Sequence, residues 1–423
     1  MTKNIKISAI PSSEYILNGI TNKVYVMIKI ETSSMEDTKK VHNPLELSIV
    51  LDRSGSMQGD KINFSKDAVN QVIENLRKGD LLNFVIYDEI IDVVFNKGDI
   101  SMKNVLKNQV NSIYSRGSTN LAGGMLQGFE VFDKNADHNR SRRIFLFSDG
   151  LANIGIKDNE GITKLAKDIY GKGINISAFG IGSDFNEELM MGIAEHAGGD
   201  YFFINGADTI PSIVGEAMDG LLNIIASNAI LKLRGINGST VKKIYAYELT
   251  HTLQLGDIKE LEERKFLVEV EIQPEKLDKS MEFLCFDLIY NPIDDLLTKQ
   301  EINHRLSIKK TDDETLIQQE NEEIVVLKGL LEVTEQELKV TELLNNLKID
   351  EAITLQTSLI AALTNLQKSD KSGDVGHKLK ISNDTLQRMQ KDKEIGSYKL
   401  SSKFNSYNYY QTRSSKLRRH RDS

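Results

Sequence analysis

The chain has 423 residues, which is more than one ordinary domain contains, so we expect roughly two or three folded units. Apolar residues make up 40% of the sequence and charged residues 27%, a composition typical of a folded protein with a substantial core. The formal net charge of −8 argues against a protein that coats nucleic acid.

Three absences in the sequence bear on the cellular compartment. The single cysteine, Cys285, cannot form an internal disulfide, so the fold does not depend on oxidising conditions. The N-terminal residues lack the continuous apolar segment of a secretory signal, and no run of about 18 apolar residues predicts a membrane span. We therefore expect a cytoplasmic protein without a membrane span, and the sequence leaves its oligomeric state open.

Residues 1–43 alternate between polar and apolar side chains, most clearly over residues 24–30. A period of two predicts half-buried antiparallel strands. The pair Asn18-Gly19 lies between two such runs and indicates a turn.

The pattern changes at residue 45, and strands then alternate with helices across residues 44–225. Residues 45–51 form a short apolar run typical of a strand that is covered on both faces. Further strands are expected at residues 81–87, 91–95, 144–147, 174–179 and 201–204, with helices between them. This alternation predicts an α/β domain with a doubly wound, mostly parallel sheet.

Residues 226–312 read as strands again, with clean alternation over residues 264–272. Neither this region nor residues 1–43 contains many strands by itself. We therefore expect the two regions to join in one β-sandwich, with the α/β domain inserted between them.

The remaining residues divide into a helical region and a tail. Residues 313–370 carry apolar side chains at three- and four-residue steps, which predicts two or three amphipathic helices. These could form a small bundle or a partner surface, and a helical cap on the β-sandwich explains the pattern equally well. Residues 371–423 have few large aliphatic side chains, so we expect a polar, partly disordered tail. Its basic end, residues 416–421, could contact nucleic acid or acidic lipid, although a solvated tail is the simpler interpretation.

Side-chain oxygens gather in three separate segments, each at a strand end or at a helix start. The candidate residues are Asp52, Ser54, Ser56, Thr119 and Asp149. Gly55 relieves crowding between the two serines. If the strand order is 3-2-1-4-5-6, Asp52 and Asp149 face each other where the order reverses, which is where open α/β sheets bind ligands.

The set contains two carboxylates and three hydroxyls, with no His or Cys. Hard oxygen ligands in this number favour Mg²⁺, with Mn²⁺ or Ca²⁺ as alternatives. The three hydroxyls are neutral, so a bound ion would keep much of its charge and attract an incoming carboxylate. The simpler alternative is a polar loop in which Asp52 or Ser56 only caps the following helix.

The pattern Asp52-x-Ser54-x-Ser56, followed by Thr119 and Asp149, resembles the metal-ion-dependent adhesion site of von Willebrand factor A (VWA) domains. The resemblance covers about residues 44–225, and residues 255–266 resemble a segment of bacterial VWA proteins and inter-alpha-trypsin-inhibitor heavy chains. It implies that the first three residues hold the ion and that Thr119 and Asp149 bind it directly or through water. It also implies that an Asp or Glu of a partner completes the coordination.

We therefore expect a protein that is not an enzyme and that binds an acidic residue of a protein partner through its metal. A scaffold that acts through its C-terminal helices is one alternative, and a Mg²⁺-dependent phosphohydrolase is another. The hydrolase is disfavoured because position 54 is serine, where acid-nucleophile enzymes usually carry a second aspartate. We place the Asp52 carboxylate in a surface loop, so Asp52→Ala should remove metal binding with little loss of fold.

Overall fold

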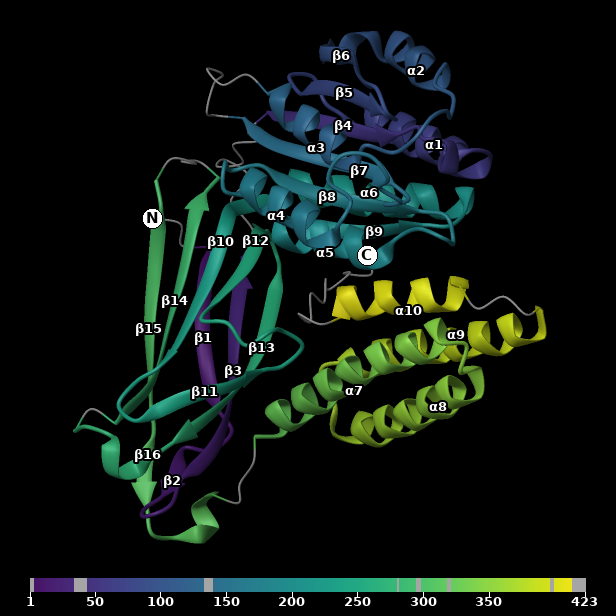
Figure 1. Cartoon of the computed structure of the whole chain (residues 1–423). Helices are drawn as coiled ribbons and strands as arrows, with labels where there is room; N and C mark the ends of the chain where they lie inside the picture. Colours follow the sequence, from purple (N-terminus) through teal and green to yellow (C-terminus); the bar gives the residue numbers. More distant parts are fainter. Residues whose placement is uncertain are drawn as a thin grey trace.

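The chain forms three parts, which Figure 1 shows as an α/β part, a sandwich of long strands and a set of C-terminal helices. The computed structural model describes residues 4–33, 44–132, 140–279, 281–293, 298–317, 321–395 and 399–412. Within these residues, no helix combines the length and the apolar character needed to cross a bilayer.

A six-stranded sheet forms the centre of the α/β part. Its strands are β4 (Leu45–Asp52), β5 (Leu81–Tyr87), β6 (Ile91–Asp99), β7 (Ser141–Ser148), β8 (Asn175–Ile181) and β9 (Gly198–Ile204). The spatial order is β6-β5-β4-β7-β8-β9, and all neighbours are parallel except β5 and β6. This is the predicted order 3-2-1-4-5-6, so the expectation of a doubly wound, mostly parallel sheet is confirmed.

Helices cover both faces of this sheet. They are α1 (Asp60–Asn75), α2 (Lys103–Asn111), α3 (Leu121–Glu130), α4 (Asn159–Tyr170), α5 (Glu187–His196) and α6 (Ile210–Leu222). Successive side chains of β4 point to opposite faces, so Ile49 packs in the core with α1, α2 and α6, and Val50 packs in the core with α3, α4 and α5. The strand is therefore buried along its whole length, and five of its eight residues are apolar.

The β-sandwich consists of two antiparallel four-stranded sheets. One contains β1 (Ile5–Pro11), β3 (Asn22–Thr32), β13 (Glu263–Ile272) and β11 (Ser239–Ile244). The other contains β12 (Thr252–Lys259), β10 (Ile224–Gly235), β14 (Glu282–Pro292) and β15 (Gln300–Ser307). A short parallel pair joins β2 (Tyr15–Leu17) and β16 (Lys309–Thr311).

The N-terminal strands and the later strands share one sheet, as expected. β3 pairs with β13 along its length, for example Ile28 opposite Phe266, and both side chains lie in the core between the two sheets. The α/β part is thus inserted into the sandwich. Because β4 begins next to the point of insertion, the carboxyl ends of the parallel strands lie at the edge of the sheet opposite the start of β4.

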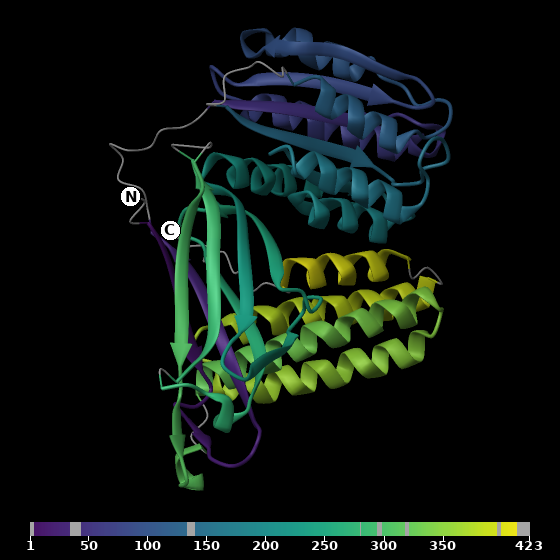
Figure 2. The same ribbon diagram turned by 60° about the vertical axis from the view of Figure 1, so that its left-hand side comes forward.

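Four helices follow the sandwich: α7 (Glu322–Asn345), α8 (Ile349–Leu366), α9 (Asp374–Ile395) and α10 (Lys399–Thr412). They form a bundle beside the sandwich and below the α/β part in Figures 1 and 2. The first half of α7 also packs Ile324, Leu327 and Leu331 against Met27 and Leu267 of the sandwich. Both the bundle and the cap interpretations of this region therefore apply.

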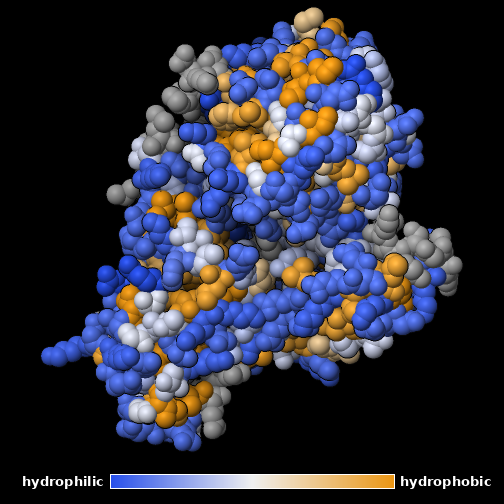
Figure 3. Space-filling view, viewed as in Figure 1, coloured by the Kyte–Doolittle hydropathy of each residue, from blue (hydrophilic) through white to orange (hydrophobic). Residues whose placement is uncertain are grey.

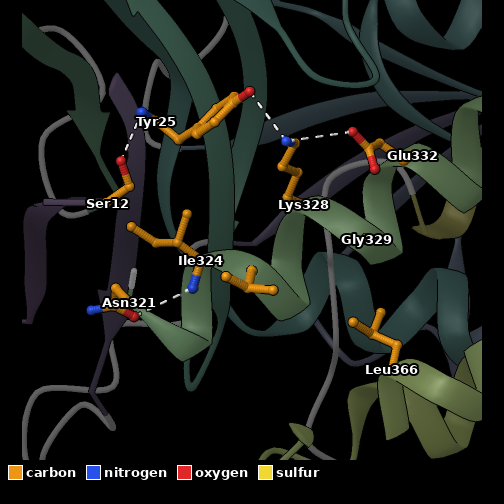
Figure 4. Close-up of a pocket in the computed structure, with 9 residues that line it drawn as sticks. Ser12, Tyr25, Asn321, Ile324, Lys328, Gly329, Glu332 and Leu366 are labelled. Atoms are coloured by element: carbon orange, nitrogen blue, oxygen red, sulfur yellow. Dashed lines mark hydrogen bonds and ion pairs between the residues drawn. The ribbon is translucent and has the colours of Figure 1, made fainter. Parts of the chain in front are cut away.

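The short 3-10 helices are η2 (Gly55–Met57), η3 (Ile100–Met102), η4 (Ala207–Thr209), η5 (Pro274–Lys276), η6 (Glu314–Ile317) and η7 (Gln367–Ser369). A pocket of about 250 Å³ lies where α7 meets the sandwich (Figure 4). In it Lys328 donates a hydrogen bond of 3.1 Å to the Tyr25 hydroxyl and lies 3.9 Å from Glu332. Its polar groups thus pair with one another.

The expectation of a tail with little core is wrong for residues 374–395 and 399–412, which form α9 and α10. Val375 and Met389 join the apolar core of the bundle. Polar groups fill other interior positions by pairing: the Lys378 ammonium lies 2.6 Å from Glu337, and both side chains are under 5% exposed. A count of aliphatic residues cannot detect a core of this kind. The basic residues 416–421 lie outside the described residues.

Candidate metal site

Asp52 ends β4, and its side chain is completely buried. Its Oδ1 accepts a hydrogen bond of 2.8 Å from the Ser54 amide, and its Oδ2 accepts bonds from the hydroxyls of Ser148 (2.7 Å) and Tyr87 (3.3 Å). These donors come from three neighbouring strands or their ends. Our expectation that this carboxylate lies in an exposed loop is therefore wrong, because the strand carries it below the surface.

The serines of the first loop lie directly beyond Asp52. Ser54 is buried, Ser56 is exposed, and their hydroxyl oxygens are 3.1 Å apart. The Gly55 amide donates a hydrogen bond of 3.0 Å to the carbonyl of Gly117. A Cβ at Gly55 would lie 3.2 Å from that same oxygen, so a glycine permits the two loops to approach.

Asp149 follows β7 and is also completely buried. Its Oδ2 accepts a hydrogen bond of 3.1 Å from the ammonium of Lys61, which also lies 2.6 Å from Asp184. Burial alone would lower the pKa of Lys61, but the hydrogen bond to Asp184 and the charge of Asp149 outweigh it and raise the pKa. Lys61 is therefore a protonated cation at neutral pH.

The two aspartates also influence each other. Burial, and then the negative charge of Asp149, raise the pKa of Asp52 to about 6, although hydrogen bonds from Ser54 and Ser148 act in the opposite direction. The structure thus brings two carboxylates from neighbouring strands close enough for their charges to repel.

Thr119 lies in the loop between α2 and α3 and is 2% exposed. Its amide donates a hydrogen bond of 2.7 Å to the Asn153 side chain, and its carbonyl accepts bonds from the amides of Asn153 and Ile154. Together with the contact between Gly55 and Gly117, these bonds tie the Thr119 loop to both other loops. All five predicted residues consequently lie at the carboxyl-end edge of the sheet.

An ion-pair network around the buried Asp88 supports the loops from the side. Asp88 follows β5 and lies 2.8 Å from Arg53 and 2.7 Å from Arg116. Burial alone would raise the pKa of Asp88, but the hydrogen bond from Arg116 and the charge of Arg53 lower it below the usual value. Asp88 is therefore more than the turn residue that its position suggests, because it joins the first loop to the Thr119 loop.

Three further residues belong to the site, although no sequence motif marked them: Lys61, Tyr87 and Ser148. Tyr87 ends the strand beside β4, and Ser148 directly precedes Asp149. Polar residues at the ends of neighbouring parallel strands could have indicated both. Lys61 is in the first turn of α1, and its distance from Asp149 along the chain conceals their contact.

The residues present fit a hard divalent cation. Two buried carboxylates repel each other, and the hydroxyls of Ser54 and Ser56 lie 3.1 Å apart in the loop that follows Asp52. Within the described part of the chain, no three His, Cys, Asp or Glu side chains gather as a metal site. The five candidate residues offer three hydroxyls and two carboxylates, and Mg²⁺ prefers such oxygens over nitrogen and sulfur.

Comparison with known protein families identifies the α/β part that carries these residues. Residues 46–216 match the family model of the von Willebrand factor type A domain. The chain contains a VWA domain. Domains of this family commonly mediate protein–protein interactions.

Each of the curated relatives described next matches less than half of this chain. An uncharacterised protein, YfbK of Escherichia coli, is 24% identical over 209 residues, which are 49% of this chain and 36% of YfbK. The inter-alpha-trypsin inhibitor heavy chain H3 of Pongo abelii is 26% identical over 168 residues, which are 36% of this chain and 18% of the heavy chain. The expected likeness to both groups is confirmed, and the chain spans well under half of either relative.

Solved structures share the fold over most of the chain. A von Willebrand factor type A protein from Catenulispora acidiphila has a TM-score of 0.68 at 16% identity, covering 88% of this chain and 90% of the other. The ArnB paralog VWA2 from Sulfolobus acidocaldarius has a TM-score of 0.64 at 15% identity, covering 97% and 98%. At these identities the likeness shows the fold alone. It extends well beyond the VWA domain to the flanking parts.

Proposed function

We propose that Asp52, Ser54, Ser56, Thr119 and Asp149 bind a divalent cation, and that the bound ion recruits an Asp or Glu of a protein partner. Mg²⁺ is the preferred ion, with Mn²⁺ and Ca²⁺ as alternatives. The observation that carries this proposal is the pair of buried carboxylates: burial, and then the negative charge of Asp149, raise the pKa of Asp52 to about 6. A cation between them would relieve a cost that the fold otherwise bears.

Each residue of the site has a part in such binding. Ser148 and Tyr87 orient the Asp52 carboxylate through hydrogen bonds of 2.7 and 3.3 Å. Lys61 neutralises part of the charge of Asp149 in the absence of a cation, and its ammonium can stay with Asp184, 2.6 Å away, when a cation takes its place. When bound, the ion supplies positive charge at an open coordination position, which attracts a carboxylate.

Exposed apolar side chains near the site support a protein as the partner. Ile90, Tyr114, Leu151 and Ile156 lie in the loops that form or adjoin the site and are between 40% and 64% exposed. Apolar residues also gather in patches on the face of the VWA domain drawn in Figure 3. Aromatic and aliphatic residues around a charged contact are typical of protein interfaces.

Titration with Mg²⁺ tests the metal site. We expect the wild-type chain to bind Mg²⁺ in isothermal titration calorimetry and Asp52→Asn to lose most of this binding, because an amide cannot replace the carboxylate charge. Asp168→Asn is the matched control, since Asp168 is an exposed aspartate of α4 in the same domain. Unaltered affinity in Asp52→Asn would contradict the proposal.

Capture of partners in Mg²⁺ and in EDTA tests the mode of binding. Immobilised wild-type chain should retain a protein in Mg²⁺ and release it in EDTA, and Asp52→Asn should retain none. A protein that stays bound in EDTA would instead favour a scaffold that acts through α7–α10.

We also propose that the chain is not an enzyme. The raised pKa of Lys61 keeps this residue protonated, so it is unsuited to act as a general base. Hydrolysis of a generic phosphate ester in Mg²⁺, abolished by Asp52→Asn, would overturn this and favour the phosphohydrolase alternative.

A further inference from the structure

Helix α10 lies between the VWA domain and the rest of the C-terminal bundle. Figures 1 and 2 both show it directly below the α/β part, with α7 and α9 on its other side. It contacts β9 and α5 of the VWA domain and α7 and α9 of the bundle. The helix is thus held by two parts of the molecule that are far apart in the sequence.

On the side of the VWA domain, α10 makes both charged and aromatic contacts. The Lys403 ammonium lies 2.7 Å from Glu187 and 5.0 Å from the centre of the Phe185 ring. The Tyr410 hydroxyl donates a hydrogen bond of 3.0 Å to the carbonyl of Gly199. The Tyr410 ring also meets Tyr201 edge-on at 5.6 Å.

These contacts cover an edge of the sheet. Strand β9 is the last strand in the order β6-β5-β4-β7-β8-β9, and Gly199 and Tyr201 belong to it. An uncovered edge strand presents unpaired backbone groups and tends to bind other chains. Helix α10 therefore protects this edge while it is docked.

The segment that α10 contacts also touches the candidate metal site. Glu187 and Phe185 flank Asn186, whose amide donates a hydrogen bond of 2.7 Å to the carbonyl of Asp149. Asn186 also packs against the turn after Asp149, because a Cβ at Gly150 would lie 3.2 Å from the Asn186 Cβ. Residues 185–187 thus contact α10 on one side and Asp149 on the other.

Polar side chains make up much of the surface that α10 buries against the bundle. Its buried polar residues are Ser401, Ser402, Asn405, Ser406 and Asn408. Ser402 donates to Asn345 at 2.6 Å, and Asn405 donates to the Glu337 carbonyl at 2.7 Å. Water can replace such bonds when the helix leaves, and release also exposes the buried rings of Tyr409 and Tyr410. The carbonyl oxygen of the Asn405 side chain even lacks a hydrogen-bond partner within the described residues.

We propose that α10 is a releasable helix that couples the C-terminal bundle to the metal site of the VWA domain. Docked α10 holds residues 185–187 in place and so keeps Asp149 ordered for the cation, and release weakens cation binding. By thermodynamic linkage, a bound cation must in turn favour the docked helix. The inference rests on the metal binding proposed above.

Mg²⁺ titration of full-length variants tests the coupling in one direction. We expect Lys403→Gln and Tyr410→Phe each to weaken Mg²⁺ binding by roughly threefold to tenfold, within or just below the usual range of coupling between sites. Lys371→Gln is the matched control, because Lys371 forms an exposed ion pair with Glu322 elsewhere in the bundle. The two effects of Lys403→Gln on Mg²⁺ affinity have opposite signs. The Glu187 charge that it leaves without its cation would by itself strengthen cation binding, so weaker binding indicates loss of the docked helix.

Hydrogen exchange of residues 399–412 tests the reverse direction. Mg²⁺ should slow amide exchange in α10 of the wild-type chain and should not do so in Asp52→Asn. Two results would overturn the coupling while leaving the metal site intact. One is that both α10 variants bind Mg²⁺ with wild-type affinity. The other is that the wild-type chain binds Mg²⁺ without any change in amide exchange of α10. A wild-type chain that binds neither Mg²⁺ nor Mn²⁺ would overturn the metal site and the coupling together.

Discussion

At the scale of single residues, the candidate site lowers the unfolding free energy of the cation-free chain. Asp52 is fully buried, and its pKa is raised to about 6 by burial and by the charge of Asp149. Three hydrogen-bond donors hold the carboxylate but do not cancel this cost. An ionised group in such a place destabilises the cation-free protein, and a bound cation removes the penalty.

The pH dependence of stability checks this conclusion. The pKa of Asp52 is about 6 in the folded chain against an ordinary value of 3.8, so the folded state holds the extra proton between these values. The cost of its charge is therefore absent below about pH 4, grows up to about pH 6 and is complete above it. In EDTA, the unfolding free energy of Asp52→Asn relative to wild type should rise by about 3 kcal/mol over this range.

Urea unfolding at a series of pH values measures this difference. The Asp168→Asn control should show a difference from wild type that does not change over the same range. A flat difference for Asp52→Asn as well would mean that its carboxyl group titrates normally in the folded chain.

At the scale of elements, the C-terminal helices show that a bundle can pack around polar groups. Lys378 of α9 and Glu337 of α7 form an ion pair of 2.6 Å in the interior, and Ser382 lies 3.4 Å from the same carboxylate. Gln356 of α8 donates a hydrogen bond of 3.1 Å to the Ser382 carbonyl. These contacts specify which helices pack together and how they are aligned along their axes, because each buried polar group needs its partner.

Breaking the Lys378–Glu337 pair should therefore be costly. Lys378→Met leaves the Glu337 carboxylate buried without its cation, and we expect a loss of about 3–5 kcal/mol of unfolding free energy. The double variant Lys378→Met with Glu337→Leu should recover most of this loss, since it leaves no charge behind. Thermal unfolding of Lys371→Met, which removes an exposed pair, should match wild type. Equal losses in the single and double variants would show that the pair matters for packing rather than for charge.

At the scale of the whole molecule, the β-sandwich and the inserted VWA domain have separate cores. The sandwich closes only when β3 pairs with β13. The buried residues of the two cores of the VWA domain lie between positions 45 and 218, except for Tyr410 of α10, which joins one of them. Buried ion pairs such as Arg143 with Asp257, 2.8 Å apart, join the two parts on the side away from the candidate site. The site edge thus stays clear of the point of insertion.

Fragments test this separation. We expect residues 44–225 to unfold cooperatively as an isolated fragment, because both faces of the sheet carry their own helices. Residues 226–312 alone should not fold, since β13 would lack β3, and addition of residues 1–33 as a peptide should restore strand content in circular dichroism. A fragment 226–312 that is already folded without the peptide would contradict this view of the sandwich.

The sequence alone was sufficient for the strand order of the VWA domain, the joining of the flanks into one sandwich, and the five residues at the carboxyl-end edge of the sheet. The elements and the site residues depend on local patterns: a period of two for the strands, alternation of strands and helices, and oxygen-bearing residues directly after apolar strands. Such patterns are visible in short stretches of chain. The joining of the flanks was inferred instead from the small number of strands in each, since neither could form a sandwich by itself.

Only the tertiary structure decided the depth of Asp52, the contact of Lys61 with Asp149, and the place of α9 and α10. Burial of Asp52 depends on the strands and loops that surround it, and the Lys61 contact joins residues 88 positions apart. The last two helices are stable because their polar side chains find partners on α7 and α8 and, for α10, on the edge of the VWA sheet. Composition predicts no core there, since pairing between distant polar groups exists only once the chain has folded.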